Sequence, residues 1–385
     1  MNFLDITKKK YYEAVKNPTP LIVGFSITQA CNLRCKLCGV SAGEPFSDEL
    51  TTAEAKSIID NLSDAGVLHL SFGGGEPTVR KDIIQLASFA SRRIESVGIV
   101  SNGFSIDSQM AWEIANAGVK HVMVSLDGSD QKTHDANRGR GSYDRVIKAL
   151  KHIKDVQLQA RISFTISQTN YNQLPEMIEL AQKYGASLNV QEFFPKGRGE
   201  GKNSLILTRK QRRDMQRLLF ETQNRIGARR IGFENRYITS EDKKTQKVCC
   251  NTALSSGFYD FCVGCFTGIY SLFVSPKGEV RLCGGLGEGK IGNLKNKSLA
   301  DIWKNSEILK KIRDREKLTG RCGKCAYRYI CGGCRKNAYY FKGDIFAEDP
   351  LCWRGRTEEE LEDTSSYTSN KIPLCKDLEQ AAAIA

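Results

Sequence analysis

The first half of the chain alternates short apolar runs with segments of helical periodicity. The apolar runs have strand length and cover residues 21–27, 67–72, 97–100, 119–126, 160–166 and 187–193. In the clearest helical segment, Thr51 and Glu54 form a capping-box sequence and Gly66 ends the helix. The apolar face of this helix consists of Ala55, Ile58, Ile59 and Leu62. The alternation predicts an α/β fold with a parallel sheet, either doubly wound or a partial barrel.

Two motifs follow the first two predicted strands. In both architectures the functional site lies at the carboxyl ends of the strands. The sequence CNLRCKLC, residues 31–38, comes directly after the first strand, and GGGEP, residues 73–77, comes directly after the second. We therefore expect both motifs at the same rim of the sheet.

Composition narrows the class of protein. The chain has 385 residues, of which 40% are hydrophobic and 26% charged, as in soluble globular proteins of two or three domains. It contains no apolar run of transmembrane length and no signal-peptide pattern, which argues against a membrane enzyme and predicts a cytoplasmic protein. The net charge of +13 favours an anionic partner such as nucleic acid, an acidic peptide or a polycarboxylate small molecule.

The fourteen cysteines are grouped at two places. Cys31, Cys35 and Cys38 are followed by none until Cys249, and the other eleven lie from there to Cys375. In a chain without an export signal, this usage indicates metal or redox chemistry rather than disulfides. We expect an N-terminal extension over 1–20, the alternating domain over 21–200, a helical bridge over 201–245, a cysteine-rich domain over 246–355 and a flexible tail over 356–385.

Three thiols within eight residues form an incomplete ligand set for zinc. A structural zinc site takes four ligands, and none of the four histidines lies within thirty residues of the motif. A 4Fe–4S cluster held by three cysteines would keep one iron open for a substrate or cofactor. The spacing favours this cluster over a zinc site or a redox thiol.

Four motifs together resemble the radical S-adenosylmethionine (SAM) superfamily. They are the C-x3-C-x2-C loop, GGEP at 74–77, SNG at 101–103 and VSLDG at 124–128, and the resemblance covers about residues 20–195. It implies a partial (β/α)6 TIM-like barrel with a 4Fe–4S cluster on Cys31, Cys35 and Cys38. The open iron would chelate the amino and carboxylate groups of SAM. Reductive cleavage would then give methionine and a 5′-deoxyadenosyl radical that abstracts a hydrogen atom from the substrate.

The resemblance also assigns SAM contacts. It places Gly74, Gly75 and Glu76 at the edge that receives the methionyl amino group, and Asn102 toward the ribose or the backbone. Ser125 and Arg138 match positions that hold the methionyl carboxylate, which a guanidinium can bind bidentately. Leu37 departs from the pattern, since the family usually has an aromatic ring against adenine there.

The C-terminal half resembles the SPASM extension of this superfamily, which carries auxiliary iron–sulfur clusters. Cys265, Gly278 and Cys283 fit the opening of its motif, although CGGC at 331–334 is one residue shorter than usual. The interlaced family pattern implies two auxiliary 4Fe–4S clusters. The first would be held by Cys262, Cys265, Cys283 and Cys334, and the second by Cys322, Cys325, Cys331 and Cys352. Cys249, Cys250 and Cys375 stay without an assigned role.

A zinc-binding nucleic-acid module is the competing interpretation of the C-terminal cysteines. C-x2-C-x5-C-x2-C over 322–334 could hold zinc on a basic surface. However, the wide gap usual between two such pairs is missing, and aromatic and basic residues do not alternate as they do in RNA-binding strands. Zinc would also leave the first motif unexplained.

The expected activity is that of a radical SAM oxidoreductase whose auxiliary clusters either bind the substrate or take up the electron left by an oxidised product. Two fully ligated clusters favour the electron-acceptor role. Our main hypothesis is a maturase that cross-links, decarboxylates or dehydrogenates a ribosomal peptide or protein, because that substrate class is the more populous. The alternative is modification of a tetrapyrrole side chain in haem or haem d1 biosynthesis, for which Lys196 and Arg198 in PKGRG, residues 195–199, would suit substrate carboxylates.

The partners follow from the same resemblance. A flavodoxin or ferredoxin is the expected electron donor. About twenty residues precede the barrel, too few for a winged-helix peptide-recognition domain, so a peptide substrate could require a separate recognition protein. The residues alone single out no catalytic acid or base.

Overall fold

The computed structural model describes residues 3–16, 19–227, 230–233, 264–286 and 290–367. Cys249, Cys250, Cys262 and Cys375 lie outside the described residues. None of the helices in these ranges combines the length and apolarity needed to cross a membrane.

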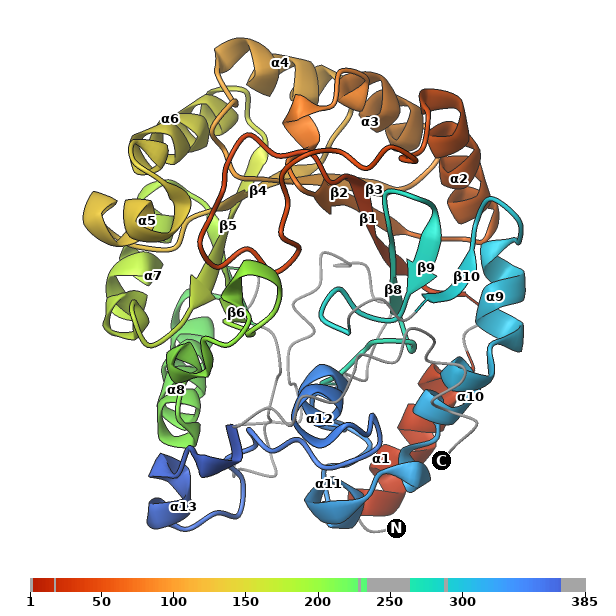
Figure 1. Ribbon diagram of the computed structural model, residues 1–385, viewed down its shortest axis with the longest axis vertical. Coiled ribbons are helices and arrows are strands. Elements are labelled where there is room, and N and C mark those ends of the chain that lie inside the picture. The colour runs from red at the N-terminus through yellow and green to blue at the C-terminus, as the bar shows by residue number, and fades with distance from the viewer. Residues whose placement is uncertain (1–2, 17–18, 228–229, 234–263, 287–289, 368–385) are drawn as a thin grey trace.

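The six predicted strands form and pair in parallel in chain order, which confirms the α/β fold. They are β1 (Ile22–Thr28), β2 (His69–Gly74), β3 (Ser96–Ser101), β4 (His121–Ser125), β5 (Gln159–Ile166) and β6 (Ser187–Glu192). Helices cover the outer side of this curved sheet (Figure 1). They are α2 (Thr52–Asp64), α3 (Ile83–Ser91), α4 (Ser108–Asn116), α5 (Gln131–Arg138), α6 (Ser142–Asp155) and α7 (Leu174–Lys183).

Helix α2 illustrates how sequence fixes these elements. Thr51 and Glu54 form the expected reciprocal capping box, which satisfies backbone N–H groups at the helix start. The four predicted apolar residues are the buried face of the helix. Gly66, with φ of +80°, turns the chain toward β2.

The cysteine-rich region continues the same sheet. β8 (Ser271–Val274) pairs in parallel with β1, and β9 (Glu279–Arg281) and β10 (Lys290–Asn293) extend that edge in antiparallel fashion. β7 (Ile231–Phe233) adds a strand beside β6 at the other edge, so the sheet has ten strands among the described residues. The region predicted as a second domain therefore shares the core of the first.

The remaining helices lie around the open side of the arc (Figure 1). They are α1 (Phe3–Ala14), α8 (Arg209–Ile226), α9 (Leu299–Asn305), α10 (Glu307–Arg313), α11 (Gly320–Lys324), α12 (Arg335–Lys342) and α13 (Glu358–Glu362). α1 is anchored to the cysteine-rich region, where the hydroxyl of Tyr11 donates to the carbonyl of Arg313 at 2.9 Å.

The first part of the expected flexible tail is docked onto α8. Thr357 and Glu360 cap α13, and Arg209 donates to the carbonyl oxygens of Glu360 and Asp363. Tyr367 is 3% exposed and belongs to an apolar cluster with Phe341. Because of these contacts, residues 357–367 are packed against the rest of the protein and do not form part of a flexible tail.

Two buried histidines stack at the amino ends of the strands, away from the motif-bearing rim. The rings of His69 and His121 lie 5.2 Å apart at an angle of 15°. Burial, aided by Arg161, lowers the pKa of His69 to about 4 and that of His121 to about 2.

We expect acid to destabilise the fold through this pair. Both rings are held neutral, so the unfolded chain binds more protons below pH 6.5, and the stability from the pair falls as pH decreases toward the lowered pKa values. The loss is about 1.4 kcal/mol per pH unit for each histidine. Thermal unfolding between pH 7.5 and 5 measures it, and His121→Gln should flatten the pH dependence. An unchanged slope in that variant would argue against this origin.

Candidate functional site

The three N-terminal cysteines lie on a loop that closes back on itself directly after β1. The N–H of Cys31 donates to the carbonyl of Gly43 at 2.8 Å and fixes the base of the loop. The N–H groups of Leu33 and Ala42 point at sulfur, to Cys31 Sγ and Cys38 Sγ respectively, both at 3.4 Å. Hydrogen bonds of this kind stabilise thiolates bound to iron–sulfur clusters.

The three thiols influence one another electrostatically. Burial raises the pKa of Cys31 and of Cys35, and in both cases the neighbouring Cys38 raises it further. Arg138 acts in the opposite direction on the pKa of Cys35. The three cysteines therefore lie on one loop whose ends are joined at Cys31 and Gly43, and Arg138 is a cation that acts on the middle thiol. Among the described residues, no three His, Cys, Asp or Glu side chains are grouped so that they could hold a single metal ion.

The glycine motif lets β2 approach the cysteine loop. A Cβ on Gly74, whose φ is +114°, would lie 2.5 Å from the carbonyl oxygen of Thr28, and one on Gly75 would lie 2.1 Å from that of Ala30. Both positions therefore require glycine. The backbone edge predicted to receive the methionyl amino group lies directly against the residues before Cys31.

The side chain of Glu76 is directed into the protein. It is fully buried and accepts hydrogen bonds from Thr78, from the hydroxyl of Ser101 at 2.8 Å and from the N–H of Asn102 at 2.6 Å. Burial raises the pKa of this carboxyl despite these bonds. Glu76 thus ties the ends of β2 and β3 together.

Asn102 lies against the cysteine loop. Its amide nitrogen donates to Asn32 Oδ1 at 2.7 Å and reaches Cys31 Sγ at 3.8 Å, and its oxygen accepts from the N–H of Phe104. Leu37, on the same loop, packs against the apolar cluster of Phe193 and Phe341.

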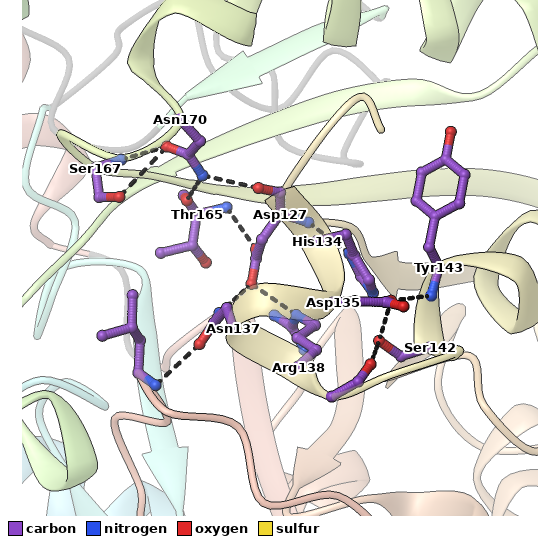
Figure 2. A network of polar contacts seen from close by, with 12 residues as sticks. Asp127, His134, Asp135, Asn137, Arg138, Ser142, Tyr143, Thr165, Ser167 and Asn170 are labelled. Atoms are coloured by element: carbon purple, nitrogen blue, oxygen red, sulfur yellow. Dashed lines mark hydrogen bonds and ion pairs between the residues drawn. The ribbon is translucent and has the colours of Figure 1, made fainter. Parts of the chain in front are cut away.

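A polar network behind the cysteine loop holds Arg138 (Figure 2). Asp127 Oδ2 accepts from Arg138 Nε at 2.6 Å and from Asn137 Nδ2 at 2.7 Å, while Oδ1 accepts from the N–H of Thr165. Asn137 also reaches the cysteine loop, since its Oδ1 accepts from the N–H of Leu37 at 3.0 Å. The network fixes α5 and the cysteine loop relative to the end of β4, where Ser125 lies.

Charge pairing sets the ionisation of this network. The side chains of Asp127 and Arg138 are only 3% and 15% exposed. Arg138 outweighs the burial of Asp127 and lowers the pKa of that carboxyl, and Asp127 in turn raises the pKa of Arg138. Among the described residues, the terminal nitrogens of Arg138 have no hydrogen-bond partner. The arrangement presents a fixed cation near Cys35.

Arg198 was considered from sequence as a ligand for substrate carboxylates, and the structure gives it a different role. Its Nε donates to the carbonyl of Cys35 and its Nη1 to the carbonyl of Ala42, both at 2.7 Å. Lys196 donates to the carbonyl of Gly284 at 3.0 Å. Both cations therefore hold the backbone of loops.

The effects of the described C-terminal cysteines on one another's pKa values define two groups. Burial raises the pKa of Cys331 to about 12, and Cys322 and Cys325 raise it further. Burial also raises the pKa of Cys352, to which Cys331 and Cys322 add. The pKa of Cys334 is raised by burial and by a different cysteine, Cys265.

These sulfurs receive the same kind of N–H contact as the first motif. The donors are Gly285 to Cys283, Asp349 to Cys322, Tyr327 to Cys325 and Gly333 to Cys331, each at 3.4 Å. Asp349, 1% exposed, also accepts from the N–H of Cys334. Its backbone and side chain thus connect the two groups.

Sequence reasoning assigned no role to three residues that shape the site, and it suggested a different role for a fourth. Asp127 stood inside a quoted motif without a role, and no sequence signal pointed to Asn137 or Asp349. Arg198 was noticed only for its charge. Each acts through partners distant in sequence, so its role becomes visible only in the fold.

Comparison with known proteins supports the same assignment. Residues 25–181 match the model of the radical SAM superfamily, and residues 265–326 match that of SPASM, an iron-sulfur cluster-binding domain. An AdoMet-dependent heme synthase of Methanosarcina barkeri is 30% identical over 341 residues, which cover 86% of this chain and 96% of that protein. The chain belongs to the radical SAM superfamily. It is a radical SAM enzyme with a SPASM domain, and it uses SAM and a 4Fe–4S cluster.

Two other proteins show similarity over most of the chain. The mycofactocin maturase MftC of Mycolicibacterium smegmatis is 29% identical over 342 residues, covering 87% of this chain and 83% of that protein. The crystal structure of Streptococcus suis SuiB bound to S-adenosylmethionine aligns with a TM-score of 0.68 at 22% identity, covering 90% of this chain and 80% of that one. The latter confirms the fold. The match to an iron-sulfur cluster-binding domain disfavours the zinc nucleic-acid module.

Proposed function

We propose that this radical SAM enzyme oxidatively modifies a side chain of a tetrapyrrole. This function is the alternative to peptide maturation that the sequence left open. The observation that carries it is the similarity to the heme synthase, which extends through both the barrel and the cysteine-rich region and spans nearly the whole of that protein. We give the tetrapyrrole precedence on this ground.

The proposed SAM site is built from the rim described above. Cys31, Cys35 and Cys38 would hold the 4Fe–4S cluster, which supplies the electron that cleaves SAM. The backbone of Gly74 and Gly75 would face the methionyl amino group. The terminal nitrogens of Arg138, together with Ser125, would bind the methionyl carboxylate. Asn102 and Glu76 would support the cluster loop and the glycine edge through the hydrogen bonds described above.

Two auxiliary 4Fe–4S clusters complete the proposal. The electrostatic grouping of Cys322, Cys325, Cys331 and Cys352 supports one four-cysteine set. The separate pairing of Cys334 with Cys265 supports the other, to which Cys283 and Cys262 would contribute. The cluster would supply one electron to cleave SAM, and a substrate carbon would then give up one hydrogen atom. The substrate would next lose one further electron as the oxidised product forms, with carbon dioxide leaving if a propionate side chain is decarboxylated. The auxiliary clusters would take up that electron.

The substrate assignment is tested with an iron tetrapyrrole that carries propionate side chains. The reconstituted enzyme is incubated without oxygen with iron coproporphyrin III, SAM and dithionite. We expect 5′-deoxyadenosine formation to increase when the porphyrin is added, and the porphyrin mass to fall by the group removed. Unchanged porphyrin with every tetrapyrrole offered would contradict the assignment, provided that SAM cleavage is active.

Peptide modification is the second candidate, because similarity to the mycofactocin maturase is nearly as extensive. A peptide encoded beside the gene, offered alone and with a separate recognition protein, forms the parallel arm of the experiment. Mass loss or cross-linking of that peptide, with intact porphyrin, would establish this function instead. In either case we propose a flavodoxin or ferredoxin as the physiological electron donor.

A further inference from the structure

We propose that residues 194–198, called the strap here, mechanically couple the radical SAM cluster loop to the first auxiliary cluster site. The inference extends the proposed function, since it takes Cys283 and Cys334 as auxiliary ligands. The strap leaves β6 at the rim of the sheet and contacts both cysteine regions within five residues. Arg198 and Lys196 are then positioning residues, acting through the two loops.

One end of the strap forms several hydrogen bonds with the radical SAM loop. The side chain of Arg198 bonds the carbonyls of Cys35 and Ala42, which lie seven residues apart on that loop. The N–H of Arg198 donates to the carbonyl of Cys38 at 3.0 Å. A Cβ on Gly197 would lie 2.5 Å from the same oxygen, so only glycine permits this approach.

The other end contacts the loops that carry Cys283 and Cys334. Lys196 donates to the carbonyl of Gly284, the residue after Cys283. The Nζ of Lys336 lies 4.6 Å from the ring centre of Phe194, and Lys336 belongs to α12, the helix that begins directly after Cys334. The ring of Phe194 also meets that of Tyr340 on α12 edge-on, with centres 4.9 Å apart.

As a consequence, the strap holds the radical SAM loop in a fixed position relative to the loops that carry Cys283 and Cys334, which lie far from it in sequence. The planar guanidinium holds the two carbonyls in one fixed geometry, which the compact ammonium on the flexible lysine chain does not reproduce. Loss of a strap contact at one end therefore lets the strap move and disturbs its contacts at the other end, whereas loss of a contact outside the strap leaves the strap in place. Under the proposed function, electron return from the substrate to the auxiliary clusters would depend on this placement.

The test changes a residue at one end of the strap and measures the effect on the loop at the other end. Arg198→Lys and Lys196→Met are prepared as reconstituted holoenzymes, and hydrogen–deuterium exchange is followed in segments 31–43 and 279–286. We expect each variant to accelerate exchange about fivefold in both segments, as loss of one net hydrogen bond predicts. We also expect Lys196→Met, which removes the side-chain hydrogen bond to Gly284, to alter the electron paramagnetic resonance spectrum of the reduced cluster with SAM.

Lys202→Ala is the matched control. Lys202 donates to the carbonyl of Lys36 at 3.0 Å, so its loss should affect segment 31–43 alone. The proposal is overturned if Lys196→Met leaves segment 31–43 and the spectrum as in the wild type, or if Arg198→Lys changes only its own end. Iron and sulfide content is measured separately. Content for a single cluster would contradict the auxiliary assignment, whereas the exchange data would still decide whether the strap couples the two loops.

Discussion

Cys35→Ala is expected to abolish formation of 5′-deoxyadenosine. Cys35 is the middle thiol of a three-thiol set, and a cluster with three protein ligands has no spare one to replace it. Alanine also removes the thiol whose pKa burial raises and Arg138 lowers. The measurement is chromatography of 5′-deoxyadenosine after anaerobic incubation with SAM and dithionite. The amount should fall to that of a reaction without enzyme.

Cys325→Ala is the matched comparison in the cysteine-rich region. Cys325 belongs to a proposed auxiliary cluster and not to the cluster that cleaves SAM. Its loss should therefore reduce product formation more than SAM cleavage. Full cleavage activity in the Cys35 variant would contradict the ligand assignment. Equal loss of cleavage and product formation in the Cys325 variant would indicate a folding role for that residue.

The strands and first helices could be predicted because their signals are local. The capping box at Thr51 and the apolar face of α2 need only the residues within one helix. Likewise, the parallel order of β1 to β6 follows from short connections between alternating elements.

The continuity of the sheet could not be predicted, because it depends on pairing across the chain. β8 has only four residues, and its partner β1 lies about 250 residues earlier. The approach requires a glycine on the partner strand, since a Cβ on Gly24 would lie 2.7 Å from the ring of Phe273. A glycine inside a strand gives no indication of which side chain covers it.

The site was predictable for its thiols and less so for their surroundings. Cysteine spacing identifies ligands directly, whereas the Arg198 contacts join residues 163 and 156 positions apart. For Glu76 the motif marked the position, yet the buried hydrogen bonds to Ser101 and Asn102 show that its side chain holds the rim together. A motif identifies the residue at a position, but it does not show whether the backbone or the side chain of that residue contacts the ligand.

Arg138 tests the SAM site most directly after the cysteines. Its Nε is engaged by Asp127, so the orientation of the guanidinium is fixed before any ligand arrives. A hydrogen-bonded charge pair with the methionyl carboxylate contributes about 1.5–3 kcal/mol, which corresponds to about 10- to 150-fold in Kd. Arg138→Gln should therefore weaken SAM binding by this factor while the cluster is retained.

Asp127→Asn separates orientation from charge. Asparagine has the shape of aspartate and can still accept from the N–H of Thr165, but it loses the ionic hold on Arg138. We expect a smaller loss of SAM affinity than in Arg138→Gln. Anaerobic isothermal titration measures both, with Arg140→Gln as a control that removes the same charge from an exposed position two residues away. If Arg138→Gln and Arg140→Gln bind SAM equally well, the carboxylate contact must lie elsewhere on the rim, and the Asp127 network would then serve only to fix α5 against the cysteine loop.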